Sequence, residues 1–94
     1  MCMRIFSTAS LDEQRALISI LVEMKDATVK HPNWPDDVVH RAAIVTEKAG
    51  ELIRAALNHH YEGGELAEMN KESIQTGATA LRFIVNSKKG GSNG

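Results

Sequence analysis

Cysteine, aromatic residues and long apolar runs are all scarce in this sequence. Its only cysteine, Cys2, cannot form a disulfide within the chain, which fits a reducing compartment. The segment from Met1 to Phe6 has no apolar run of the length that a signal peptide needs, and no stretch approaches the roughly 18 apolar residues of a membrane span. We therefore expect a cytoplasmic protein that does not enter a membrane.

An excess of positive charge is also lacking. The formal net charge is −1, so the chain has no broad basic surface that could neutralise a phosphate backbone. Duplex nucleic acid is therefore not an expected partner. What is present is 43% hydrophobic residues in a chain of 94, most of them aliphatic, which is typical of one small helical domain.

The first predicted helix has a clear start and a clear end. The sequence Ser10-Leu11-Asp12-Glu13 has the form of a capping box, in which a serine hydroxyl and a glutamate three residues later bind each other's backbone amides. Apolar residues then recur at helical spacing as far as about Lys30. The prolines of the segment His31–Pro35 halt this helix, since each disfavours the helical conformation in the residue before it.

Two more helices are predicted after this loop. Pro35 or Asp36 is well placed to open the second helix, which we expect to run to about Tyr61. The pair Gly63–Gly64 forms the next turn, because glycine ends a helix at positive φ with least steric cost. A third helix is predicted from about Glu65 to Asn86.

The expected fold is an all-α helical bundle with one domain at residues 10–86. Residues 1–9 form an N-terminal segment, and residues 87–94 have almost nothing to bury and are predicted to be a flexible tail. Three helices with broad apolar faces bury more surface together than alone. We therefore expect self-association, as a dimer or as a dimer of dimers.

Glutamates recur at helical spacing on two of the predicted helices. Glu47 and Glu51 share one face of the second helix, and Glu65, Glu68 and Glu72 share one face of the third. If these two faces pack together, they form an oxygen-lined site suited to Mg²⁺. The alternative is a pair of solvated faces, neutralised by the basic residues Lys48, Arg54 and Lys71.

Two stretches of the sequence combine these acids with a recognisable pattern. One begins at Trp34-Pro-Asp-Asp and continues through Ala43-Ile-Val-Thr-Glu47-Lys-Ala-Gly-Glu51-Leu, and the other is Lys71-Glu72-Ser-Ile-Gln-Thr-Gly-Ala-Thr-Ala-Leu-Arg82-Phe. Together they resemble the MazG-like group of all-α nucleoside triphosphate pyrophosphohydrolases over about half of the chain. The resemblance implies a helical bundle with oligomeric active sites, and Mg²⁺-dependent hydrolysis of nucleoside triphosphates to monophosphate and pyrophosphate.

The acidic signature of that group is a Glu-x-x-Glu pair on one helix and a Glu-x-x-Asp pair on the next. Glu51 matches the second acid of the first pair, and Glu72 matches the first acid of the second. Lys48 and Gln75 stand where the other two acids would be. Glu47 and Glu68, each one turn before a matching acid, lie near the same faces and can compensate.

The resemblance, the helical spacing and the chemistry of the side chains together give a set of candidate site residues. Glu47 and Glu51 are the catalytic candidates, one of them orienting the attacking water as a base. The candidate Mg²⁺ ligands are Glu47, Glu51, Glu68, Glu72 and Gln75. The candidate contacts to the nucleoside triphosphate are Trp34, which could stack on a base, and the phosphate-pairing residues Lys48, Arg54 and Arg82.

Other roles stay open for several of these residues. Lys48 and Gln75 motivate a rival hypothesis, in which the chain is a non-catalytic helical oligomer that binds nucleotide or a protein partner. Trp34 could instead cover the end of the bundle. The basic candidates could form surface ion pairs.

Overall fold

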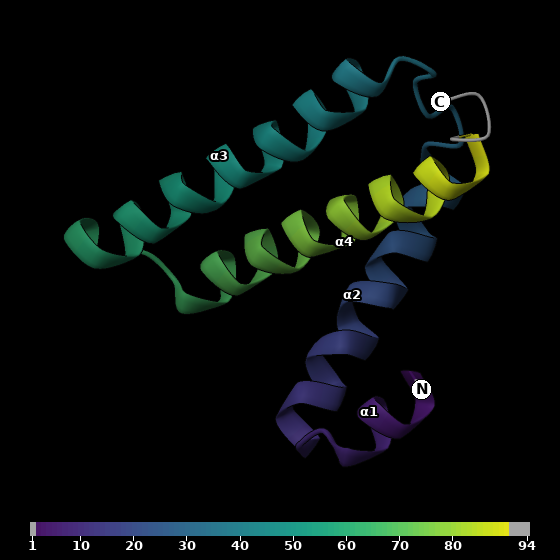
Figure 1. Ribbon diagram of the computed structural model, residues 1–94. Helices are drawn as coiled ribbons and strands as arrows, with labels where there is room; N and C mark the ends of the chain where they lie inside the picture. The colour runs from purple at the N-terminus through teal and green to yellow at the C-terminus, as the bar shows by residue number, and fades with distance from the viewer. Residues whose placement is uncertain (1, 91–94) are drawn as a thin grey trace.

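The computed structural model describes the backbone of residues 2–90 and the side chains of residues 4–87. All regular structure in this part of the chain is helical, as predicted. The four helices are α1 (Cys2–Thr8), α2 (Leu11–Lys30), α3 (Val38–Glu62) and α4 (Leu66–Gly90). Figure 1 shows α3 and α4 side by side as a hairpin, with α2 crossing at its side and α1 at the far end of α2. Within residues 2–90 no helix is both long and apolar enough to cross a membrane.

The predicted capping box forms at the start of α2. The backbone amide of Glu13 donates to Ser10 Oγ at 3.1 Å, and the amide of Ser10 donates to Glu13 Oε1 at 2.8 Å. Two amides that the first turn leaves without helical partners are thereby satisfied. The helix ends at Lys30, before Pro32, as the sequence predicts.

The start of α3 differs from the prediction. The helix begins at Val38 rather than at Pro35 or Asp36, because the carboxylate of Asp37 acts as its N-cap. Asp37 Oδ2 accepts a hydrogen bond from the amide of His40 at 3.1 Å. Pro35 and Asp36 therefore belong to the loop.

The turn after α3 follows the prediction. Gly63 has a φ of 73°, and the C-cap at this position lies in the left-handed region that glycine adopts without a steric penalty. The backbone amide of Gly64 then donates to the Asn58 carbonyl at 3.0 Å. This turn reverses the chain, and α4 returns antiparallel along α3 (Figure 1).

The two ends of the chain contain more helix than expected. The short α1 lies within the predicted N-terminal segment, and the side-chain amide of Gln14 holds its end by donating to the carbonyls of Phe6 at 3.3 Å and Ala9 at 3.0 Å. No periodic apolar pattern in residues 1–9 of the sequence predicts this helix. At the other end, α4 continues past Asn86 to Gly90, since no proline interrupts it. Residues 91–94 of the predicted tail lie outside the described residues.

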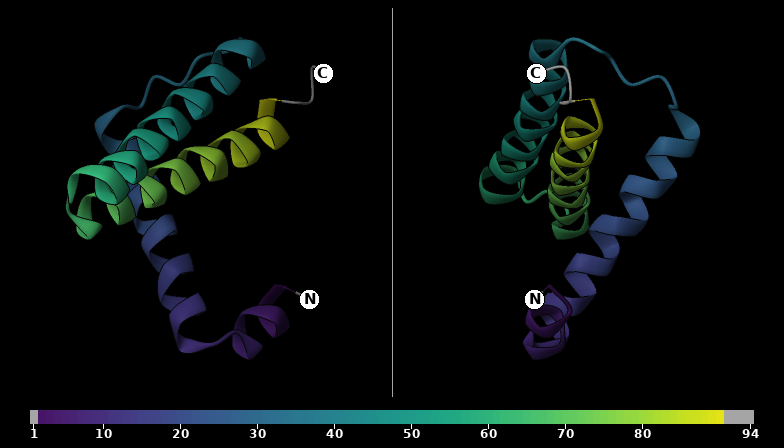
Figure 2. Two further views of the ribbon diagram at one scale, coloured as in Figure 1. Left: turned by 90° about the vertical axis from the view of Figure 1, so that its left-hand side faces the viewer. Right: turned by 45° about the vertical axis from the view of Figure 1, so that its right-hand side comes forward.

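Helix α4 lies between α3 and α2 and makes the main contacts with both (Figure 2). At the crossing with α2, a Cβ atom on Gly77 would lie 3.1 Å from Ile20 Cδ1, so glycine allows this close approach. The core is very small. Among the described side chains only Ala78, 3% exposed, and Arg82, 7% exposed, are buried, while most large apolar residues remain in contact with solvent.

Candidate functional site

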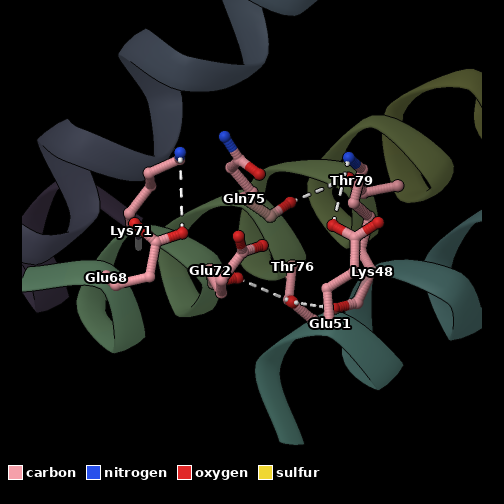
Figure 3. A network of polar contacts seen from close by, with 8 residues as sticks. All are labelled: Lys48, Glu51, Glu68, Lys71, Glu72, Gln75, Thr76 and Thr79. Atoms are coloured by element: carbon pink, nitrogen blue, oxygen red, sulfur yellow. Dashed lines mark hydrogen bonds and ion pairs between the residues drawn. The ribbon is translucent and has the colours of Figure 1, made fainter. Parts of the chain in front are cut away.

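Polar side chains from α3 and α4 form a row along one face of the hairpin (Figure 3). Residues three or four apart on a helix lie on one face, and the antiparallel pairing places the polar face of α3 beside that of α4. Thr76 Oγ1 fixes this pairing, since it lies 3.1 Å from the Lys48 carbonyl and 2.8 Å from the Glu72 carbonyl. The polar row comprises Lys48, Glu51, Glu68, Lys71, Glu72, Gln75, Thr76 and Thr79.

Glu72 stands at the centre of the acids in this row. Its Oε1 atom is buried and has no hydrogen-bond partner. Burial, followed by the negative charges of Glu51 and Glu68, raises the pKa of the Glu72 carboxyl above its ordinary value, and the nearby Lys71 ammonium opposes this effect. A hydrogen bond that the protonated Glu72 carboxyl can share with Glu51 raises the pKa further. A carboxylate in such a place gains from a proton or from a cation.

Two lysines pair with the other acids of the polar row. Lys48 Nζ lies 3.6 Å from Glu51 Oε1, and Lys71 Nζ lies 3.7 Å from Glu68 Oε2. These side chains are partly exposed, so each pair contributes only about 0.2–1 kcal/mol. The pairs can therefore open for a ligand at small cost.

The candidate residues line two hollows that follow one another along this face. The first, which we name the acid groove, has a volume of about 840 Å³ and lies toward the turn of the hairpin; its lining includes Glu51, Arg54, Asn58, Tyr61, Glu68 and Glu72. The second, which we name the Trp34 cavity, has a volume of about 460 Å³; its lining includes Met24, Trp34, Glu47, Lys48, Gln75 and Arg82. The structure thus brings together Glu51, Glu68 and Glu72 but places Glu47 and Gln75 around the second hollow.

Arg82 joins α4 to the loop before α3. Its guanidinium donates from Nη2 to the His31 carbonyl at 2.8 Å, and its Cζ atom lies 4.5 Å from the centre of the Trp34 ring. Burial lowers the pKa of this group, which still stays protonated at neutral pH. These contacts position the loop, whereas the sequence predicts contact with phosphate.

Two residues that line the Trp34 cavity have buried donors without partners. Trp34 Nε1 and Arg82 Nε are both buried and have no hydrogen-bond partner. A buried donor without a partner costs about 1–3 kcal/mol, so a ligand or water that offers an acceptor is favoured there. The residues that α2 adds to this cavity, Glu23, Met24, Ala27 and Lys30, are not apparent from the sequence. Their periodicity shows that they are helical but not which helix they meet.

The acids of the polar row fit Mg²⁺ in part. Within the described side chains, no three His, Cys, Asp or Glu residues converge closely enough to hold a metal ion by themselves. Glu51 and Glu72 nevertheless lie together, with the unpartnered Glu72 oxygen between the two helices. Mg²⁺ keeps several waters and is often held by only one or two carboxylates and the phosphates of a substrate. These residues thus suit Mg²⁺ that is bound together with a phosphate ligand.

Comparison of the chain with protein-family models, with curated proteins and with solved structures found no match.

Proposed function

We propose that this protein is a MazG-like nucleotide pyrophosphohydrolase, which hydrolyses a ribo- or deoxyribonucleoside triphosphate to the monophosphate and pyrophosphate. The observation that supports this most is the buried, unpartnered carboxylate oxygen of Glu72 beside Glu51. A second support is the position of the acids next to a cavity that Trp34 and Arg82 line.

In this proposal the polar row binds the phosphates. Glu51 and Glu72 would hold Mg²⁺, which would supply positive charge to the phosphate oxygens and make water more acidic. Lys48 and Arg54 lie on either side of Glu51 in the sequence and offer positive charge to the remaining phosphate oxygens. Glu68 supplies the additional carboxylate that accepts a proton from the attacking water.

The nucleoside part of the substrate then lies in the Trp34 cavity. The indole ring offers a flat apolar surface, and the Arg82 guanidinium beside it offers positive charge to the acceptors of a base. Because the cavity directly follows the acid groove along the hairpin, one extended nucleotide can occupy both.

The test is pyrophosphate release from a panel of nucleoside triphosphates, with and without Mg²⁺. We expect wild-type activity that depends on Mg²⁺ and falls by roughly 100-fold or more in Glu72→Gln, the loss typical of removing a group that stabilises charge in the transition state. Glu65→Gln is the matched control, since Glu65 is an exposed glutamate that lines neither hollow, and it should retain activity. Wild-type protein without activity across the whole panel would refute the proposed hydrolysis.

A second candidate is a helical module that binds nucleotide without hydrolysing it. The ion pair between Lys48 and Glu51 favours it, because an ammonium group occupies the place beside Glu51 where a further acid would complete a metal site. Under this alternative the double substitution Lys48→Glu with Gln75→Asp creates Mg²⁺ binding that calorimetry does not detect in the wild type. Strong Mg²⁺ binding by wild-type protein would contradict it.

We also propose that the chain self-associates, as a dimer at least. Its accessible surface is 7095 Å², whereas a folded monomer of 10.3 kDa exposes about 5,400 Å². The difference of about 1,700 Å² exceeds the roughly 800 Å² that each partner buries in a standard interface. A cytoplasmic location completes the proposal, since Cys2 stays reduced there.

A further inference from the structure

One side of α3 is uncharged and exposed along most of its length. At 3.6 residues per turn these side chains fall within an arc of about 120°, which is the width of the apolar face that a helix usually turns toward a core. Its larger members, such as Ile53 at 57% exposed, are in contact with solvent. We name this surface the α3 stripe; it comprises Val39, Ala42, Ala43, Thr46, Ala49, Gly50, Ile53 and Leu57.

The centre of the α3 stripe is built for close approach of another helix. Ala49 and Gly50 lie at its middle, and a Cβ atom added to Gly50 would meet nothing within 4 Å. Small side chains let two helix axes come near the lower end of the usual 8–10 Å separation. Larger residues toward the two ends, including Val39 and Leu57, would then pack around this central contact.

Two opposite charges along one border of the α3 stripe favour a second copy of this chain as its partner. Glu47 and Arg54 lie on the same border, seven residues apart, and neither forms an ion pair among the described side chains. Within one helix they are about 10 Å apart along the axis, too far to pair with each other. In two antiparallel copies related by a two-fold axis near Gly50, Glu47 of each copy faces Arg54 of the other.

We infer that a second copy of this chain packs along the α3 stripe, with the two α3 helices antiparallel and two reciprocal Glu47–Arg54 ion pairs at the border. The surface that the monomer exposes beyond the expected value is enough for such an interface. This assignment rests on the proposed self-association; it shares Arg54 with the proposed phosphate site, but its test measures the dimer dissociation constant and does not depend on hydrolysis. Because Arg54 also lines the acid groove, the second copy borders that groove.

Sedimentation equilibrium of the full chain tests this surface. Ile53→Glu should raise the dimer dissociation constant by at least roughly 100-fold, because two-fold symmetry places the charge twice in an apolar contact. Ile18→Glu is the matched comparison, since Ile18 is an isoleucine 53% exposed in α2, and it should leave the constant within about threefold. Circular dichroism checks that both variants remain helical.

A charge exchange tests the antiparallel register. Glu47→Arg and Arg54→Glu should each weaken the dimer, and the double variant should restore it to within a few-fold of the wild type, as expected for a direct pair. Absence of this rescue would overturn the register. Wild-type protein that is monomeric at all concentrations would refute the self-association itself. A dimer that Ile18→Glu dissociates and Ile53→Glu does not would place the interface on α2 and overturn the α3 stripe as the contact.

Discussion

Replacing Arg82 by methionine should loosen the loop before α3 from the rest of the molecule. The substitution keeps a flexible stem of similar shape but removes the guanidinium, which donates to the His31 carbonyl at 2.8 Å and lies over Trp34 at 4.5 Å. Among the described side chains, only Arg82 connects α4 to this loop through both a hydrogen bond and a cation–π contact.

The expected cost follows from these two contacts. A hydrogen bond from a charged donor contributes about 1.5–3 kcal/mol. A cation over an aromatic ring in a desolvated place adds about 2 kcal/mol. Arg82 is only 7% exposed, so its removal also removes the desolvation cost of a buried charge, which offsets part of the lost contacts. We therefore expect a net loss of about 1–3 kcal/mol in the free energy of unfolding.

Urea denaturation at fixed protein concentration, followed by circular dichroism, measures this loss as a lower midpoint at an unchanged slope. Trp34 is the only tryptophan, so its fluorescence reports the loop directly and should shift to longer wavelength in the native baseline. Arg15→Met is the matched control because Arg15 is exposed on α2, and it should change stability by less than about 0.5 kcal/mol. An Arg82→Met protein with unchanged stability and unchanged fluorescence would refute the role of Arg82 in holding the loop.

Three further substitutions have outcomes that the structure determines. Because the pKa of Glu72 is raised in the folded protein, the native state binds a proton more readily than the unfolded state, and this contribution to stability falls as pH rises through and above the ordinary glutamate range. Glu72→Gln should remove this fall, as measured by denaturation midpoints across that range. An unaltered pH profile of stability would contradict the prediction. Gly63→Ala should cost about 1–2 kcal/mol, since alanine at a φ of 73° is strained, and an unchanged melting temperature would argue against this C-cap. Ser10→Ala should cost about 0.5–2 kcal/mol through loss of the α2 cap, whereas Ser19→Ala, exposed in mid-helix, should cost much less; equal thermal shifts would exclude the capping role.

Local signals in the sequence were sufficient for both ends of α2 and for the turn between α3 and α4. The capping box at Ser10 and the left-handed Gly63 depend only on residues three or four apart, so the pattern and the structure agree there. The start of α3 could not be fixed in this way, since Pro35, Asp36 and Asp37 are all acceptable at a helix start and the choice depends on which carboxylate reaches the amide of His40.

The candidate site was predictable only where it depends on one hairpin. Glu51 and Glu72 come together because a short turn joins two helices whose acidic faces have the same spacing. The position of α2 has no such local cause. It depends on Gly77 admitting Ile20 and on Arg82 reaching His31, contacts between residues far apart in the sequence that no periodic pattern encodes.

Helix α4 contacts α3 on one side and α2 on the other, and these two contacts should form at different rates during folding. The hydrogen bond from Thr76 to Lys48 within the α3–α4 hairpin spans 28 residues, whereas the hydrogen bond from Arg82 to His31 spans 51 residues, and closing a longer loop costs more entropy and slows folding. We therefore expect the hairpin to form first and to open last. Amide exchange should then be faster in α2 than in the hairpin, and separation of α2 from α4 would expose the Trp34 cavity while Glu51 and Glu72 stay together.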